Sequence, residues 1–269
     1  MVMLPVTYYP VATQELFRHN SERIKGKPYA KYFNGDLWLH DDVMPFIQRA
    51  MPSDAALTSS PEDLNTLLDT GYQKVETGFC VTDDGHPYVT SLTRFPGCTP
   101  EMFTWWFWWH SVEPERYSLW YPYNHQQAIP RDQDVLTRPG VTDVDRYIGN
   151  THDIIEYIGP MRSELTIQFR HPSELGFDTS RFAQSDVSAH ACGELSMNNG
   201  VMLHLVRTTA DGFELRSRYI FDRGKTYSTD EERAEALGFA YEMLLHDQTE
   251  FTHLSTFLAS IYQEFGNQG

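Results

Sequence analysis

His246 and Glu250 stand four residues apart in a stretch whose apolar residues repeat with the period of a helix. Residues three and four apart share a helical face, so both fall on an apolar stripe that includes Met243 and Leu254. An unpaired charge there would cost several kcal/mol of desolvation. The ordinary interpretation, which holds for most isolated His-x-x-x-Glu motifs, is a hydrogen-bonded pair inside the core or a locally hydrated patch. The alternative is that both residues bind one metal ion from a single helical turn.

A metal site would need further donors, and two residues elsewhere are candidates. Strand alternation in the segment 151–160 puts Glu156 among isoleucines, and His125 follows a cluster of tryptophans and tyrosines. Each has an ordinary alternative, because Glu156 can lie on the polar side of an edge strand and His125 can simply be packed. His253 and His110 are rival ligands, and for His253 we favour a solvated or supporting role.

The elements that must position these residues can be read from the pattern. A terminal helix is expected from Ser228, where Glu231 completes a capping box, to about Gly266. At 1.5 Å per residue it would span roughly 50 Å. Before it, alternating segments predict antiparallel strands at 153–159, 164–171, 187–195, 200–209 and 212–221. We expect an α+β fold in which the helix lies across a curved sheet.

The chain divides into an extension and a main domain. Residues 1–71 contain scattered Pro, Asn and Asp and are expected to be largely irregular, with one short helix capped by Ser60. Residues 72–269 are expected to form one domain. It opens with two strands joined by a turn at Asp83–Gly85, followed by helices beginning at Pro100 and Pro114 and a loop over 128–151.

Composition excludes several classes of partner. The formal net charge of −16 argues against nucleic acid and anionic membrane surfaces. We expect no transmembrane helix, because no run of about 18 apolar residues occurs, and the N-terminal pattern predicts no signal peptide. Three widely spaced cysteines make a disulfide framework improbable and fit a reducing cytoplasm. The sequence does not determine the oligomeric state; a homodimer is one option.

Four segments together resemble the 2,4-diacetylphloroglucinol hydrolase family, which includes phloretin hydrolase. They read "WWFWWHSVEPERYSLWYPYNH", "DIIEYIG", "SAHACGE" and "HDQTE". The tryptophan-rich segment is the most distinctive, and the first 70 residues contribute little. The resemblance implies a helix-grip (START-like) fold and a zinc-dependent hydrolase that cleaves the carbon–carbon bond between an acyl group and a phenolic ring.

The resemblance also implies roles for individual residues. Zinc would be held by two histidines and two glutamates, which map onto His125, Glu156, His246 and Glu250. A histidine near the substrate maps onto His190, and a tyrosine that binds phenolic oxygens maps onto Tyr117. The four tryptophans at 105–109 can line a pocket for a flat ring or form core packing; of these we take Trp109 as the substrate contact.

The chemistry expected of such a site is demanding. Breaking an aryl–acyl bond in water needs an electrophilic carbonyl and a ring carbon that is protonated as the bond breaks. Zinc can act as a Lewis acid or lower the pKa of a water to about 7. His190 or a glutamate such as Glu156 would then move protons. Two alternatives remain: a metal-free carrier of a hydrophobic ligand, and a cyclase or esterase acting on a related aromatic polyketide.

Overall fold

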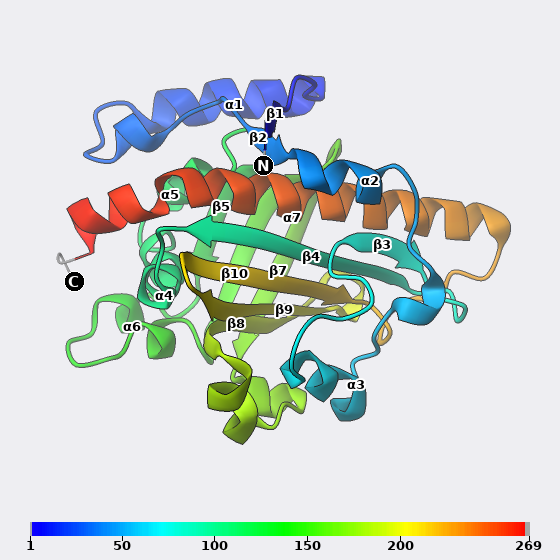
Figure 1. Ribbon diagram of the computed structural model, residues 1–269. Helices are drawn as coiled ribbons and strands as arrows, with labels where there is room; N and C mark the ends of the chain where they lie inside the picture. Colours follow the sequence, from blue (N-terminus) through cyan, green and yellow to red (C-terminus); the bar gives the residue numbers. More distant parts are fainter. Residues whose placement is uncertain (1, 267–269) are drawn as a thin grey trace.

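The computed structural model describes residues 2–266 and is built on one large antiparallel sheet with a long helix across it (Figure 1). Every neighbouring pair of strands in the sheet is antiparallel. In sheet order the strands are β3 (Gly78–Val81), β4 (Pro87–Pro96), β10 (Gly212–Ile220), β9 (Val201–Thr209), β8 (Val187–Leu195), β7 (Met161–Arg170), β6 (Thr151–Ile158) and β5 (His125–Pro130). The predicted α+β class is therefore confirmed.

Helix α7 (Asp230–Phe265) has 36 residues and crosses one face of the sheet (Figure 1). Its capping box is formed by Thr229 and Glu232, so the helix begins one residue later than the pair Ser228 and Glu231 predicted. The C-terminal limit is as expected, because the helix ends immediately before Gly266.

Two buried clusters lie on opposite faces of the sheet. The larger one lies between the sheet, α7 and the helices α4 (Pro100–Trp109) and α5 (Pro114–Trp120), both of which begin where predicted. The smaller one packs the other face against α3 (Pro61–Asn65), which Ser60 caps by accepting a hydrogen bond from the Asp63 N–H. The remaining helices are α2 (Met44–Ile47) and α6 (Asp134–Thr137), with short 3-10 turns at 30–32, 41–43, 53–55, 66–68, 144–146, 172–175, 179–185 and 197–199.

The N-terminal extension is more regular than its sequence predicted. It contains α1 (Val11–Ile24) and a two-stranded sheet of β1 (Met3–Pro5) and β2 (Trp38–His40). The buried positions of α1 include the polar residues Thr13 and Asn20 beside Leu16 and Ile24, so no apolar stripe marks the helix.

The region expected to be a loop over 128–151 also contains regular structure. Its first residues belong to β5, which pairs with β6 at the edge of the sheet, and α6 follows. A strand of six residues at an edge, ending in Pro130, has little alternation to reveal it. The turn at Asp83–Gly85 between β3 and β4 is as predicted, with φ of Gly85 at +84°.

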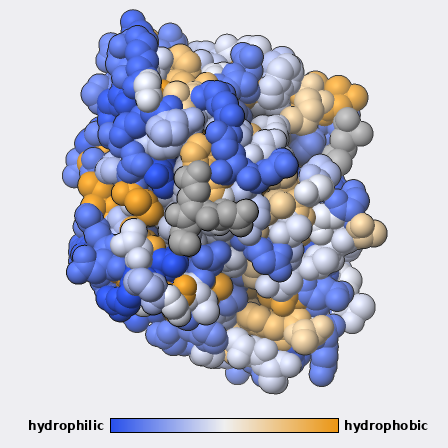
Figure 2. Space-filling view, turned by 90° about the vertical axis from the view of Figure 1, so that its left-hand side faces the viewer, coloured by the Kyte–Doolittle hydropathy of each residue, from blue (hydrophilic) through white to orange (hydrophobic). Residues whose placement is uncertain are grey.

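The surface is mainly polar on the side where α7 ends. Figure 2 shows that face as largely hydrophilic, with several separate hydrophobic patches. Within residues 2–266, no helix is both long and apolar enough to cross a membrane. The three cysteines are buried and unpaired.

Candidate metal centre and active site

Four acidic and imidazole side chains converge between the sheet and α7. His125 and Glu156 are direct partners in the register of β5 and β6, which places their side chains next to each other. His246 and Glu250 lie four residues apart on α7 and face the same region. All four residues are buried, with at most 7% of any of them exposed.

The donor atoms of this group face one another at short range. Nε2 of His125 lies 3.3 Å from Nε2 of His246, 3.2 Å from Oε2 of Glu250 and 3.6 Å from Oε2 of Glu156. Nε2 of His246 lies 3.8 Å from Oε2 of Glu250 and 3.9 Å from Oε2 of Glu156. Donors held by a tetrahedral zinc ion at about 2.0–2.2 Å are separated by roughly 3.3–3.6 Å. The spacing therefore suits a small divalent cation.

The protonation states also suit a cation. Burial lowers the pKa of His246 to about 4, and burial together with the neighbouring His246 holds the pKa of His125 well below its usual range. Both imidazoles are therefore neutral at pH 7 and can offer a lone pair. Nδ1 of His125 lies 3.3 Å from the carbonyl oxygen of Tyr117, a contact that directs Nε2 toward the other donors.

The pKa values of the two carboxyl groups are shifted in the opposite direction. Burial raises the pKa of Glu156 to about 7, although a hydrogen bond from Tyr117 opposes the rise. Burial, with the nearby carboxyl groups of Asp247 and Glu156, raises the pKa of Glu250 well above its usual range. In the described ion pairs the partners of these two carboxyl groups are histidines and not lysine or arginine, so a divalent cation could balance their charge.

Tyr117 is bonded to this group from α5. Its hydroxyl donates a 2.6 Å hydrogen bond to Oε2 of Glu156, and its ring stacks on His125 with centroids 3.9 Å apart. The sequence assigned Tyr117 to a substrate oxygen. The structure instead gives its hydroxyl a partner among the candidate ligands, while the residue still forms part of the cavity wall.

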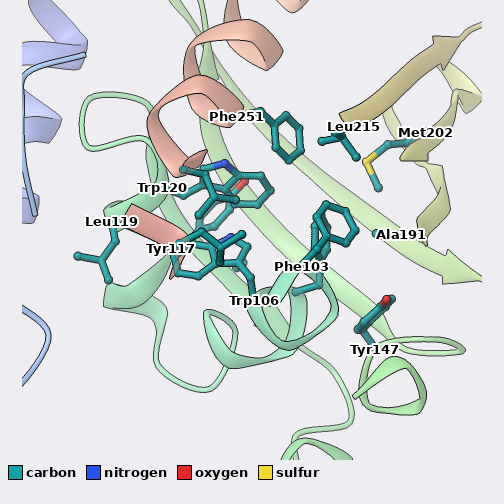
Figure 3. Packing of buried hydrophobic residues seen from close by; sticks show 14 of the residues in the cluster. Phe103, Trp106, Tyr117, Leu119, Trp120, Tyr147, Ala191, Met202, Leu215 and Phe251 are labelled. Atoms are coloured by element: carbon teal, nitrogen blue, oxygen red, sulfur yellow. The ribbon is translucent and has the colours of Figure 1, made fainter. Parts of the chain in front are cut away.

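A cavity of about 580 Å³, part of it continuous with solvent, lies beside the donors. Aromatic residues, among them Phe107, Phe169 and Tyr219, form much of its wall. Tyr117 and Trp120 also line it, and Figure 3 shows these two next to Trp106 of the core. Met197, Met202 and Met243 also line it, and methionine side chains adapt easily to a ligand. The cavity is narrow and apolar, with a few polar groups directed into it, as in small-molecule sites.

The sequence as a whole is similar to known proteins. Residues 57–263 match the family model described as DAPG hydrolase PhiG domain. The chain is 34% identical over 285 residues to the 2,4-diacetylphloroglucinol hydrolase of Pseudomonas protegens, covering 98% of this chain and 93% of that protein. The chain belongs to the DAPG hydrolase family. It is also 32% identical over 196 residues to the phloretin hydrolase of Eubacterium ramulus, covering 70% of this chain and 71% of that protein.

In this member of the DAPG hydrolase family, His190 lies away from the cavity. Its neighbours Ala189 and Ala191 belong to the cluster beneath α7, so alternation along β8 turns His190 to the opposite face. There its ring contacts His171 and Phe182, with centroids 5.8 and 6.1 Å away. The structure therefore does not bring His190 to the donors, and the catalytic and substrate-binding role expected of it stays a prediction.

Trp109 is likewise outside the cavity. Its ring stacks on Trp105 with centroids 4.8 Å apart, and the guanidinium carbon of Arg116 lies 4.1 Å from its ring centroid. It packs against Phe265 near the end of α7, more than three turns beyond Glu250. Of the two roles considered for the tryptophans at 105–109, pocket lining and core packing, Trp109 has the second in this structure.

The two rival histidines have other surroundings. Nδ1 of His110 lies 2.7 Å from the carbonyl oxygen of Trp106, one turn earlier in α4, and the residue forms part of the cavity wall. His253 is buried against Phe257, with ring centroids 5.2 Å apart. Neither belongs to the group of His125, His246 and Glu250, whose donor atoms lie within 4.8 Å of one another.

Sequence reasoning missed three polar residues of the cavity wall, His152, His204 and Tyr219. Nδ1 of His204 lies 2.9 Å from Oγ of Ser217, its direct partner in the register of β9 and β10. The hydroxyl of Tyr219 donates a 2.9 Å hydrogen bond to Oδ2 of Asp247. Alternation along "GVMLHLVRTT" placed His204 between apolar residues on a buried face, which was the available signal.

Proposed function

We propose that this chain is a zinc-dependent hydrolase acting on a small aromatic ketone. The bond cleaved joins an acyl group to a polyhydroxylated phenolic ring, as in an acylphloroglucinol, and the products are a short carboxylic acid and the deacylated phenol. The observation that carries the proposal is the convergence of His125, Glu156, His246 and Glu250 at the wall of an aromatic cavity. Membership of a family whose relatives are named for such substrates supports the choice of reaction.

Those four residues would hold the zinc ion, which when bound supplies Lewis-acid polarisation of a substrate oxygen. The aromatic wall orients a flat ring and excludes bulk water, and Tyr219 and His204 provide polar contacts for its oxygens. Burial lowers the pKa of His204 to about 3, so its imidazole acts as a neutral hydrogen-bonding group near pH 7.

The reaction balances with one water molecule. The bond between ring carbon and carbonyl carbon breaks, the carbonyl carbon gains the hydroxyl group of water, and the ring carbon gains a proton. A group that moves this proton works best with a pKa near the operating pH. Glu156 and the Tyr117 hydroxyl, which lies 2.6 Å from Oε2 of Glu156, are the groups of this chain placed to move that proton.

We also propose that the fold is of the helix-grip (START-like) type and that residues 72–269 form the catalytic domain. All four proposed ligands belong to that part. The extension 1–71 would support it, because Nδ2 of Asn20 in α1 donates hydrogen bonds to the carbonyl oxygens of His125, at 2.8 Å, and Pro122, at 3.0 Å. Loss of these bonds would release the strand end that carries His125.

The test combines metal analysis with product analysis. Purified protein is assayed for bound metal and then incubated with mono- and diacylphloroglucinols and phloretin. We expect stoichiometric zinc and release of the free acid. His246→Ala and Glu250→Gln should lose zinc and turnover together. His253→Gln is the matched control, since it changes a buried histidine of the same helix outside the donor group and should keep both.

The outcomes separate the rival functions. A protein that binds the aromatic ketone without zinc and without turnover is a carrier. Cyclised or de-esterified products in place of a deacylated ring indicate another enzyme of aromatic polyketides. Full turnover by Glu250→Gln without bound metal would refute the proposed site.

A further inference from the structure

The inner cavity described above adjoins a second, more open hollow. This hollow, the outer groove, has an empty volume of about 1610 Å³ and is formed by the first half of α7, the turn between β6 and β7, and the segment after β8. Leu165 and Met197 belong to the walls of both spaces. The two residues therefore stand where the outer groove meets the inner cavity.

Met197 immediately precedes a turn with two residues in the left-handed backbone conformation. The next two residues, Asn198 and Asn199, have φ of +50° and +47°, in the left-handed region that asparagine tolerates better than most residues. Oδ1 of Asn198 accepts a 2.6 Å hydrogen bond from the N–H of Lys225. A Cβ at Gly224 would lie 1.9 Å from the carbonyl oxygen of Asn198, so only glycine fits there. The backbone is thus fixed, while the unbranched Met197 side chain can adjust.

The position of the outer groove relative to the donors is set by α7. Gly238 lines the groove and precedes His246 by eight residues, about 12 Å along the helix. Met243, which lines the inner cavity, lies between them. The groove therefore lies along α7 on the N-terminal side of the donors.

The wall of the outer groove suits a neutral, partly aromatic chain. Phe239, Tyr227 and Tyr241 contribute aromatic surface, and Glu164, Glu235 and Glu242 contribute acidic groups. An acyl chain that ends in a carboxylate would be repelled by these acids, whereas an alkyl chain or a phenol would not.

From this shared wall we infer that the outer groove is the subsite for the acyl chain and that Met197 is the adjustable gate between the groove and the inner cavity. This inference rests on the proposed function, because it takes the acyl carbonyl to bind at the four donors. A short acetyl group ends before the groove, while a longer chain passes Met197 and lies along α7. The residues of the outer groove, which contact neither the donors nor the ring, then determine which acyl chain lengths the site accepts.

Gly238 offers a direct test, because nothing lies within 4 Å of a Cβ placed on it. Gly238→Leu would place a side chain at the wall of the outer groove, and leucine is a better helix former than glycine. Ala234→Leu is the matched control, being exposed, one turn earlier on α7 and outside the groove wall. The probes are monoacetylphloroglucinol and phloretin, whose long acyl chain ends in a phenol, assayed for kcat/KM and for binding to the zinc-loaded protein by tryptophan fluorescence.

We expect Gly238→Leu to lower the ratio of kcat/KM for phloretin to that for monoacetylphloroglucinol by about tenfold or more, the usual scale when a site loses room for part of a chain. Ala234→Leu should leave the ratio as in the wild type. Met197→Trp, which narrows the junction itself, should lower phloretin binding in the same way.

An unchanged ratio and unchanged phloretin binding in Gly238→Leu would overturn the subsite, while hydrolysis of monoacetylphloroglucinol would still support the proposed function. If the wild type hydrolyses neither probe but Gly238→Leu weakens phloretin binding, the subsite stands and the proposed reaction fails. A wild type that neither binds nor hydrolyses phloretin would overturn the inference.

Discussion

The hydroxyl of Tyr117 donates a hydrogen bond to Oε2 of Glu156, the oxygen that faces both candidate histidine ligands. The same tyrosine stacks on His125 and has its carbonyl oxygen 3.3 Å from Nδ1 of that histidine. One residue of α5 therefore orients two of the four proposed ligands. Groups that orient ligands in this way often affect metal affinity nearly as much as the ligands do.

Tyr117→Phe should therefore weaken zinc binding by about 10–100-fold, because Glu156 loses the hydrogen bond that fixes its carboxyl group. Competition with a chromophoric chelator at fixed pH measures the affinity. Tyr147→Phe is the matched control, since Tyr147 is a buried tyrosine that donates to the backbone carbonyl of His190 and does not line the cavity. Unchanged zinc affinity with a lower kcat/KM would instead assign Tyr117 to the substrate, as the sequence alone suggested.

Local pattern predicted much of the fold because local physics determines it. The periodicity of α7 placed His246 and Glu250 on a buried face, and alternation along β6 placed Glu156 there as well. Helix α1 was missed because two of its buried positions are polar. Its Asn20 is buried because the side chain donates hydrogen bonds to the carbonyl oxygens of Pro122 and His125. A contact with such a distant segment leaves no local sequence pattern.

The assembly of the site depends on long-range register, which sequence pattern does not carry. His125 is adjacent to Glu156 only because β5 pairs with β6 at one particular alignment. The positions of His190 and His204 depend on the strands in a related way. Both histidines lie on strands with apolar neighbours, but alternation faces His204 toward the cavity and His190 away from it.

Substituting His204 and His190 one at a time tests which of the two histidines contributes to activity. His204→Gln should lower kcat/KM by about 10–100-fold, since losing a hydrogen-bonding group in a buried site costs about 1–3 kcal/mol. His190→Gln serves as the control and should keep wild-type kinetics, because its ring lies on the other face of the sheet. Steady-state kinetics with monoacetylphloroglucinol, with zinc content verified, measures both. A large loss in His190→Gln with normal zinc and normal thermal stability would restore the role assigned from the sequence.

Zinc binding should release protons, and the carboxyl groups rather than the histidines should be their source. Burial raises the pKa of Glu156 to about 7 and that of Glu250 well above its usual range, so both groups hold protons in the metal-free protein near pH 6. The lowered pKa values of His125 and His246 mean that the imidazoles have none to lose. Because bound zinc requires carboxylates, its apparent affinity should fall as the pH decreases below about 7.

Calorimetric titration at pH 6 in two buffers with different ionisation enthalpies measures the number of protons released. We expect between one and two, decreasing as the pH rises through the pKa of Glu156. Glu156→Gln removes one of the two sources, so the variant should release about one proton fewer while binding zinc more weakly. Proton release that is absent at pH 6, or that persists undiminished in Glu156→Gln, would mean that the buried carboxyl groups are already ionised before the metal arrives.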